Sequence, residues 1–149
     1  NLSLPSTGFE NAWGSTSGAT LTAAGATGGG VLVGDAGNDT LTGGNGADFI
    51  YGGAGNDTIN GGTGNDNLIG DGGVDTFRFG ASWGRDIVWD WVNGSEKFNL
   101  AGSDATSFAQ LTVNQNVGGS GNASIAFGAN LILVVGGANQ IDASDFLFV

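Results

Sequence analysis

Five aspartates recur at nine-residue intervals in the first half of the chain, and each lies two positions after a glycine. They are Asp39, Asp48, Asp57, Asp66 and Asp75. Their carboxylates and the carbonyl oxygens around them are ligands that suit hard cations. Calcium accepts roughly six to eight oxygens in irregular geometry, whereas magnesium requires a near-ideal octahedron. The chain has no His and no Cys, which removes the usual zinc and copper ligands. The pattern therefore predicts calcium binding.

These aspartates belong to five consecutive nine-residue blocks that run from Gly34 to Arg78. The blocks read GDAGNDTLT, GGNGADFIY, GGAGNDTIN, GGTGNDNLI and GDGGVDTFR. The eighth position always holds a large apolar residue, in turn Leu41, Ile50, Ile59, Leu68 and Phe77. Residues 25–33, GATGGGVLV, fit as a degenerate first turn in which Gly30 stands at the aspartate position.

Each block predicts a glycine-rich turn followed by a three-residue strand. The middle residue of such a strand points inward and its neighbours point outward, so the eighth positions should stack as a core. One block cannot bury its apolar face alone, and neighbouring blocks must therefore stack on one another. Parallel stacking also aligns the carboxylates, whose mutual repulsion a bound divalent cation converts into attraction.

The blocks resemble the calcium-binding nonapeptide repeat of the RTX family. The resemblance implies a parallel β-roll in which successive turns lie on opposite sides and each ion lies between repeat n and repeat n+2. It pairs Asp39 with Asp57, Asp48 with Asp66, and Asp57 with Asp75, which gives about three or more Ca²⁺ ions. A further site between the 28–30 turn and Asp48 would lack one carboxylate.

Backbone carbonyls of the turns are expected to complete each calcium shell. The expected contributors are Gly37, Gly44, Gly46, Gly53, Gly55, Gly62 and Gly64. Glycine suits these places because it adopts positive φ and lets carbonyl groups approach a ligand closely. Asp35 and Asp71 replace glycine at the second position, where they are either extra ligands or solvated residues.

The chain is expected to be all-β, with a parallel β-roll followed by an antiparallel β cap. Residues 1–33 form a flanking segment with the degenerate turn, residues 34–79 the β-roll, and residues 80–149 the cap. The cap strands are expected at residues 86–92, 97–100, 108–113, 124–127 and 131–135. On the first of these strands Trp91 is expected in the core. Trp89 would share its face and, if exposed, could stack on a sugar.

The second half also resembles the C-terminal segment of type I secretion substrates. The residues that carry this resemblance are Asp86, Asp90, Trp91, the run Lys97 to Leu100, and the closing run Asp145 to Val149. It implies that the closing run is an export signal read by the type I secretion machinery, although a plain edge strand explains the same residues. Asp86 and Asp90 are candidates for closing the last calcium-binding turn.

The net charge of −11, with only Arg78, Arg85 and Lys97 as basic residues, disfavours nucleic acid and anionic membranes as partners. Without His, Cys or a serine-centred motif, the chain is not expected to be an enzyme. We expect a secreted or cell-surface, monomeric calcium-binding module of a larger type I-secreted protein. The alternative is a carbohydrate- or surface-binding module of a bacterial adhesin. Ice binding is disfavoured because no outward position holds threonine in every block.

Overall fold

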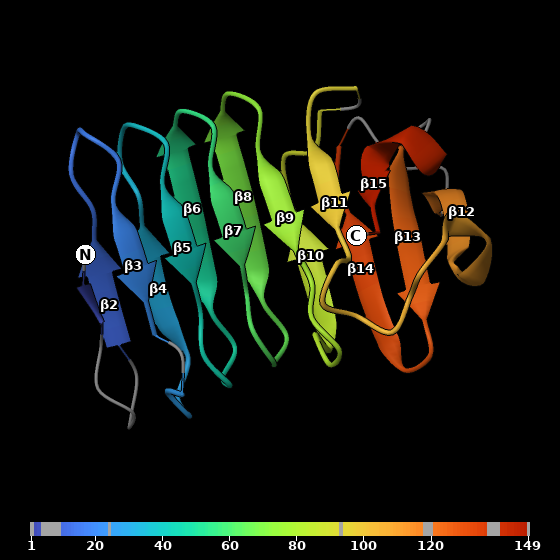
Figure 1. Cartoon of the computed structure of the whole chain (residues 1–149), viewed down its shortest axis with the longest axis horizontal. Helices are drawn as coiled ribbons and strands as arrows, with labels where there is room; N and C mark the ends of the chain where they lie inside the picture. Colours follow the sequence, from blue (N-terminus) through green and yellow to red (C-terminus); the bar gives the residue numbers. More distant parts are fainter. Residues whose placement is uncertain are drawn as a thin grey trace.

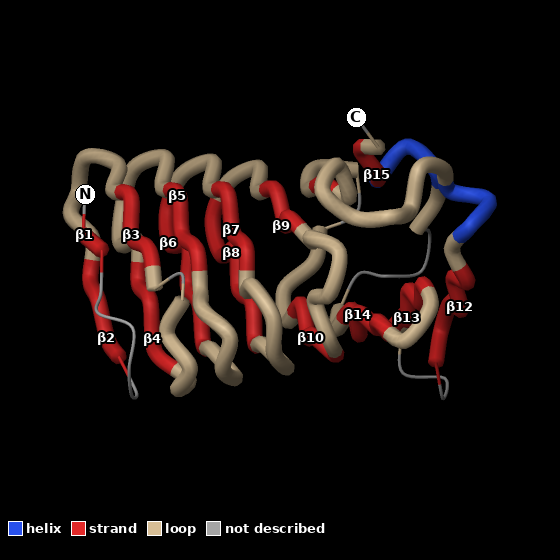
Figure 2. The backbone as a smooth tube through the Cα atoms, turned by 60° about the horizontal axis from the view of Figure 1, so that its bottom comes forward, coloured by secondary structure: helices blue, strands red, loops and turns tan. Residues whose placement is uncertain are grey.

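The computed structural model describes residues 2–3, 10–23, 25–92, 94–117, 121–136 and 141–148. Within these residues the strands form two sheets that face each other, and from β1 to β11 the chain passes from one sheet to the other at each turn (Figures 1 and 2). No helix in the described parts of the chain is long and apolar enough to cross a membrane.

The first sheet, called sheet A, contains seven strands of the described chain. In spatial order they are β1 (Leu2–Ser3), β3 (Thr20–Thr22), β5 (Thr40–Thr42), β7 (Thr58–Asn60), β9 (Thr76–Arg78), β11 (Lys97–Asn99) and β15 (Phe146–Leu147). The pairs along this sheet are parallel. Sheet A therefore collects every second block of the repeat.

The second sheet, sheet B, contains eight strands of the described chain. In spatial order they are β2 (Glu10–Trp13), β4 (Gly30–Val33), β6 (Phe49–Ala54), β8 (Asn67–Gly72), β10 (Arg85–Val88), β14 (Asn130–Val134), β13 (Asn122–Phe127) and β12 (Thr112–Val117). Two 3-10 helices, η1 (Phe108–Gln110) and η2 (Ala143–Asp145), lie in the C-terminal part. Pairing is parallel from β2 to β14 and antiparallel among β14, β13 and β12.

The register of the ladders places the apolar eighth positions directly above one another. Leu41 pairs with Ile59 and Ile59 with Phe77 in sheet A, while Ile50 pairs with Leu68 in sheet B. All five side chains are fully buried between the sheets. The predicted core is therefore confirmed, and it arises because a three-residue strand exposes both flanking residues and buries the middle one.

The predicted fold class, a parallel β-roll with an antiparallel cap, is confirmed. The parallel ladders extend beyond the expected ends of the β-roll at residues 34 and 79. At the first end β3 pairs with β5, and at the second β10 pairs with β8 and β11 with β9. They continue into β14 and β15, which pair in parallel with β10 and β11. The antiparallel part of the cap is limited to the β12–β13–β14 meander.

Two expected cap strands differ from the structure. Residues 108–110 form η1 instead of a strand, and β12 begins only at Thr112. The strand expected at 86–92 ends at Val88, so the chain turns before Trp91. Trp91 is 2% exposed and Trp89 is 46% exposed, and the two indoles therefore do not share a face.

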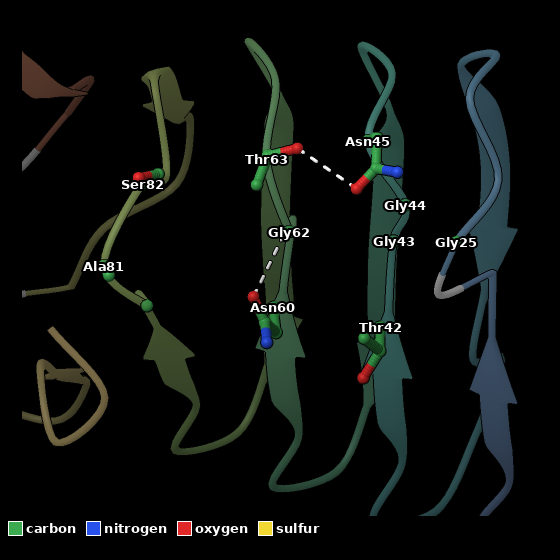
Figure 3. A pocket seen from close by; sticks show the side chains of 11 residues that line it. Gly25, Thr42, Gly43, Gly44, Asn45, Asn60, Gly62, Thr63, Ala81 and Ser82 are labelled. Carbon is green, nitrogen blue, oxygen red and sulfur yellow. Dashed lines mark hydrogen bonds between the residues drawn. The ribbon is translucent and has the colours of Figure 1, made fainter.

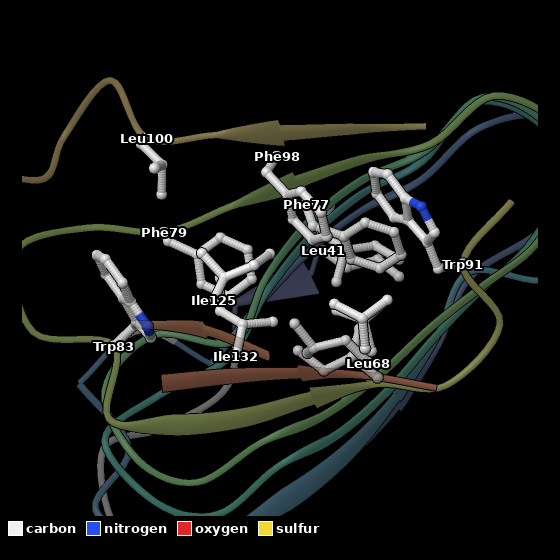
Figure 4. Close-up of a cluster of buried hydrophobic side chains, with 14 of the residues drawn as sticks. Leu41, Leu68, Phe77, Phe79, Trp83, Trp91, Phe98, Leu100, Ile125 and Ile132 are labelled. Carbon is white, nitrogen blue, oxygen red and sulfur yellow. The ribbon is translucent and has the colours of Figure 1, made fainter. Parts of the chain in front are cut away.

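An aromatic cluster closes the C-terminal end of the core (Figure 4). The rings of Trp91 and Phe98 stack with centroids 4.1 Å apart, and Phe77 lies 6.4 Å from each of them. Phe146 from β15 extends the cluster, 5.3 Å from Phe98. The last apolar residue of the strict repeat is thus covered by residues from the cap.

The outward faces of the two sheets differ in composition. Sheet A carries a row of threonines in register, which ends at Lys97: Thr20, Thr40, Thr58 and Thr76. The sequence expectation that no threonine ladder forms is wrong for this sheet. The reason is that consecutive blocks alternate between the two sheets, so each block must be compared with the second block after it, which lies in the same sheet.

Candidate calcium-binding turns

The glycine-rich turns form two columns along opposite edges of the roll. The first column consists of residues 34–39, 52–57 and 70–75, which lead from sheet B into sheet A. The second consists of residues 43–48, 61–66 and 79–86, which lead from sheet A into sheet B. Every turn ends at an acidic residue that lies two positions before an inward apolar residue.

Six aspartates are buried at the ends of these turns, each at most 2% exposed. The first column holds Asp39, Asp57 and Asp75, and the second holds Asp48, Asp66 and Asp86. The structure therefore places all five sequence-predicted aspartates in the two columns. It brings together the three expected pairs, and it places Asp86, one of the two candidates for closing the last turn, at the end of the second column.

One carboxylate oxygen of each aspartate accepts a hydrogen bond from the backbone of the preceding turn in its column. The Asp39 N–H donates to Asp57 Oδ1 (2.7 Å) and the Asp57 N–H to Asp75 Oδ1 (2.8 Å). In the second column the Asp48 N–H donates to Asp66 Oδ1 (2.9 Å) and the Asp66 N–H to Asp86 Oδ1 (2.9 Å). These bonds orient the carboxylates identically along each edge.

The other oxygen is buried without a hydrogen-bond partner in five of the six aspartates, counted over the described chain. These atoms are Asp39 Oδ2, Asp57 Oδ2, Asp66 Oδ2, Asp75 Oδ2 and Asp86 Oδ2. A buried carboxylate oxygen without a partner is unfavourable, and a bound cation is the group that would compensate it. Asp48 differs because its Oδ2 accepts from the Gly44 N–H at 2.8 Å.

Burial disfavours the charged forms of these acids. It raises the pKa of Asp66 and of Asp75 to about 6, and that of Asp86 to about 8. The neighbouring aspartate of the same column raises each pKa further, while the backbone hydrogen bond lowers it. The pKa values of Asp48 and Asp57 are raised as well, again chiefly by burial. A divalent cation beside these oxygens would favour ionisation.

The glycines predicted as carbonyl ligands all lie in the two columns, Gly37, Gly53 and Gly55 in the first, and Gly44, Gly46, Gly62 and Gly64 in the second. Gly55 has a φ of 138°, and a Cβ at this residue would collide with the Gly37 carbonyl oxygen of the turn stacked on it. The described residues contain no group of three or more acidic, His or Cys side chains that could hold a metal ion by themselves. A cation held here would therefore take much of its shell from carbonyl oxygens, as calcium tolerates.

Asp86 and Glu96 extend the columns beyond the nine-residue pattern. The turn before Asp86 is longer, so Asp86 lies 20 residues after Asp66, whereas the earlier partners are 18 apart. Glu96 precedes Phe98 as Asp75 precedes Phe77, and burial raises its pKa to about 7. The signal that identifies both is an acid two positions before an inward apolar residue.

Three other aspartates do not belong to the two columns of buried aspartates. Asp35 and Asp71 are exposed and adopt positive φ of 79° and 68°, as Gly53 and Gly62 do at the same position of their blocks. Asp90 accepts hydrogen bonds from the Gly70 N–H (3.1 Å) and the Asp71 N–H (2.5 Å). Asp90 therefore fastens the end of the first column to the cap.

A polar pocket of about 270 Å³ lies beside the second column (Figure 3). Thr42, Asn45, Asn60, Thr63 and Ser82 contribute side chains to it, and the Thr63 hydroxyl donates to Asn45 Oδ1 at 3.3 Å. No acidic residue lines this pocket. The buried carboxylates therefore do not line it, although Gly44, whose N–H donates to Asp48 Oδ2, does.

Residues 25–59 and 51–88 match the model of the RTX calcium-binding nonapeptide repeat, in four copies. This region belongs to the RTX repeat family. RTX nonapeptide repeats bind calcium, and the matched range includes the five predicted aspartates and Asp86. The unpaired Oδ2 atoms in the columns are thus found within repeats of a calcium-binding family.

Comparison with solved structures finds chains of similar shape. The chain resembles the AlgE6R3 subunit of the Azotobacter vinelandii mannuronan C5-epimerase, with a TM-score of 0.53 and 20% identity over 91% of this chain and 81% of that one. It also matches the extracellular lipase LipA from Serratia marcescens, with a TM-score of 0.48 and 16% identity over 93% of this chain and 40% of the lipase. No curated protein is significantly similar in sequence. The epimerase likeness supports the fold.

Proposed function

We propose that this chain is a non-catalytic calcium-binding module that folds outside the cell when it meets millimolar calcium. The observation that carries the proposal is the set of buried Asp Oδ2 atoms, which lack a partner in the described structure and recur along both turn columns. Without a cation the ionised carboxylates within each column repel one another and disfavour the folded state. The free energy of calcium binding therefore contributes directly to the free energy of folding. Calcium-specific sites of extracellular modules typically have dissociation constants of roughly 10⁻⁴ to 10⁻³ M.

Each ion is proposed to lie between two successive turns of one column. The pairs are Asp39 with Asp57, Asp57 with Asp75, Asp48 with Asp66, and additionally Asp66 with Asp86. Support comes from the backbone hydrogen bonds that already join the members of each pair. The carbonyls of Gly37, Gly44, Gly46, Gly53, Gly55, Gly62 and Gly64 are proposed to complete the shells.

The test is a calcium titration of the full chain, followed by circular dichroism and by isothermal titration calorimetry. We expect β structure to increase cooperatively with calcium, and magnesium to be a poor substitute at equal concentration. The melting temperature should rise with calcium concentration because calcium binds the folded state. Equal β content and equal melting temperature in chelator and in millimolar calcium would refute the proposal.

The pairing is tested by Asp57→Asn, since Asp57 takes part in two pairs of the first column. This substitution should reduce the number of bound calcium ions by about two, whereas Asp39→Asn should reduce it by about one, on the oxygen-ligand requirement of calcium. Asp104→Asn is the matched control, because Asp104 is exposed and lies outside both columns. Equal losses for Asp57→Asn and Asp39→Asn would show that the ions are not placed between successive turns.

We further propose that the chain is exported unfolded by a type I system and that the run Asp145 to Val149 carries the export signal. RTX proteins are typically exported in this way, and calcium-dependent folding would keep the chain unfolded inside the cell. In the folded protein Phe146 is buried, so a deletion of the run perturbs the fold as well. Phe98→Ala separates the two effects because it damages the same cluster and leaves the run intact.

The export experiment compares both variants in a host that carries the transporter. Phe98→Ala should be secreted at the level of the unmodified chain although it folds poorly. Deletion of Phe146 to Val149 should abolish secretion. Normal secretion of the deletion variant would refute the signal, and loss of secretion in both would show that folding, rather than the signal, determines export.

A further inference from the structure

The outward face of sheet B carries a row of large apolar residues that runs along the axis of the roll. Trp13 pairs with Val33, Val33 with Tyr51, and Tyr51 with Ile69. Trp89 continues the row, because it follows Val88, the partner of Leu68, and its N–H donates to the Leu68 carbonyl at 3.1 Å. We call these residues the aromatic row: Trp13, Val33, Tyr51, Ile69 and Trp89.

A second row lies beside it on the same face, with Val31, Phe49, Asn67 and Ile87 in register. Neither row contains a charged residue. Trp13 is 62% exposed, Trp89 46% and Tyr51 38%, so the rings remain accessible. Sheet A presents polar residues, mostly threonine, at its corresponding positions. An apolar face of this size on one side of an acidic protein indicates a binding surface.

Trp89 is fixed in place on this face. Its Nε1–H donates to Asn67 Oδ1 at 2.9 Å, and Asn67 belongs to β8, the neighbouring strand. The bond holds the indole toward β8 while leaving Trp89 46% exposed. A ring that is already positioned loses little conformational freedom when a ligand binds.

The spacing of the three aromatic side chains is set by the strand order. Trp13 lies on β2, Tyr51 on β6 and Trp89 at the end of β10, which are every second strand of sheet B. Neighbouring strands are about 4.8 Å apart, so successive aromatic positions are about 9 to 10 Å apart. In a β-1,4-linked chain of hexopyranoses each ring is flipped relative to the last. Every second ring therefore presents the same C–H face, at nearly this spacing.

We propose that the aromatic row binds a neutral β-1,4-linked polysaccharide, laid along the axis of the roll with every second sugar on an aromatic ring. The charge distribution favours this ligand over the others. The net charge of −11 remains negative even after the four proposed Ca²⁺ ions are bound, and it disfavours an anionic chain. Asp35 and Asp71 are exposed just beyond Val33 and Ile69, and two copies placed face to face would oppose these acids. Sugar hydroxyls can donate to the same carboxylates.

The experiment measures binding of cellohexaose and of chitohexaose to the full chain in millimolar calcium, by calorimetry and tryptophan fluorescence. We expect saturable binding of at least one of them. Trp89→Ala, Tyr51→Ala and Trp13→Ala should each weaken it about tenfold, which corresponds to ~1.4 kcal/mol. Val74→Ala is the control, since Val74 is 50% exposed but lies outside both rows.

Every variant is first shown to keep its calcium-induced circular dichroism. Absence of binding to both oligosaccharides by a calcium-folded chain would overturn the inference and leave the calcium proposal intact. Unchanged affinity in Trp89→Ala and Tyr51→Ala would also overturn it. Sedimentation equilibrium gives a third outcome: a dimer that Trp89→Ala dissociates would show that the face pairs two copies of this chain instead.

Discussion

The column aspartates use their two carboxylate oxygens differently. Oδ1 accepts a backbone hydrogen bond from the turn before it, and in all but Asp48 the buried Oδ2 has no partner in the described structure. A neutral side chain such as asparagine could keep the first interaction and lose the second. Substitution by asparagine should therefore weaken cation binding while it preserves the hydrogen bond that packs one turn on the next.

Asp86 provides this test at the end of the second column. Asp86→Asn should remove about one bound calcium ion and shift the folding midpoint to higher calcium, because Asp66 loses its partner carboxylate. The measurement is calorimetric stoichiometry together with a circular dichroism titration. Asp104→Asn is again the control, being exposed and outside the columns. An unchanged stoichiometry would show that Asp86 acts only in packing.

The pH dependence of the calcium-free roll should have an unusual sign. Burial raises the folded-state pKa of Asp66 and Asp75 to about 6 and of Asp86 to about 8, from 3.8. The folded state therefore binds more protons than the unfolded state between these values. The stabilising contribution is fully present below pH 3.8 and is lost as the pH rises through 6 and 8. Calcium should reverse the trend, because it requires the ionised carboxylates.

Thermal unfolding of calcium-depleted protein at about pH 5 and about pH 9, with and without added calcium, measures this effect. We expect the depleted protein to contain more β structure, and to show any melting transition at a higher temperature, at about pH 5 than at about pH 9, whereas the gain in β structure on adding calcium should be larger at about pH 9. A depleted protein that becomes more stable with rising pH would contradict the prediction.

The nine-residue spacing predicted five of the six column aspartates, and the structure shows why it could not predict the sixth. A period can be read from sequence only while each turn keeps its length. The turn from Phe79 to Asp86 is longer, which removes Asp86 from the pattern although its hydrogen bond to the Asp66 N–H is preserved. The nine-residue spacing also does not show which blocks pair, because the pairing depends on how the blocks alternate between the two sheets.

At the scale of elements, the cap strands were less predictable than the repeat. The apolar residues of the cap are compatible both with strands and with turns that fill the core. Trp91 and Phe108 were expected on strands, but the first strand ends at Val88 and Phe108 begins a 3-10 helix. Their burial arises from packing on Phe98 and Phe146. Such contacts are distant in sequence, and local patterns do not encode them.

The cap should contribute to stability through Phe98, which contacts both solenoid and cap. Phe98→Ala removes a fully buried ring that stacks on Trp91 at 4.1 Å, and should cost about 3 to 5 kcal/mol of unfolding free energy. Denaturant unfolding in saturating calcium measures it. Val74→Ala, at a half-exposed turn position, should change the free energy by no more than about 0.5 kcal/mol. Similar effects for both would show that the cluster packs loosely.

At the scale of the whole molecule, the roll is a stack in which each turn is stabilised mainly by its neighbours. Stability then depends on nearest-neighbour contacts and on how the ends are closed. Without a cap, Phe77 and the unpaired edges of β8 and β9 would face solvent. The structure closes this end with β10, β11, β14 and β15 in parallel register and with the aromatic cluster.

The cap should therefore be required for calcium-induced folding of the repeats. A chain truncated after Gly80 retains the five aspartates predicted from the sequence and loses Asp86 and the rings that cover Phe77. We expect it to show no calcium-induced increase in β structure at concentrations that fold the full chain. Asp86→Asn in the full chain is the matched comparison, since it removes the ligand and keeps the cap. If the truncated chain folds at the same calcium midpoint as that variant, the turns nucleate one another unaided, and the cap contributes only what Asp86 contributes.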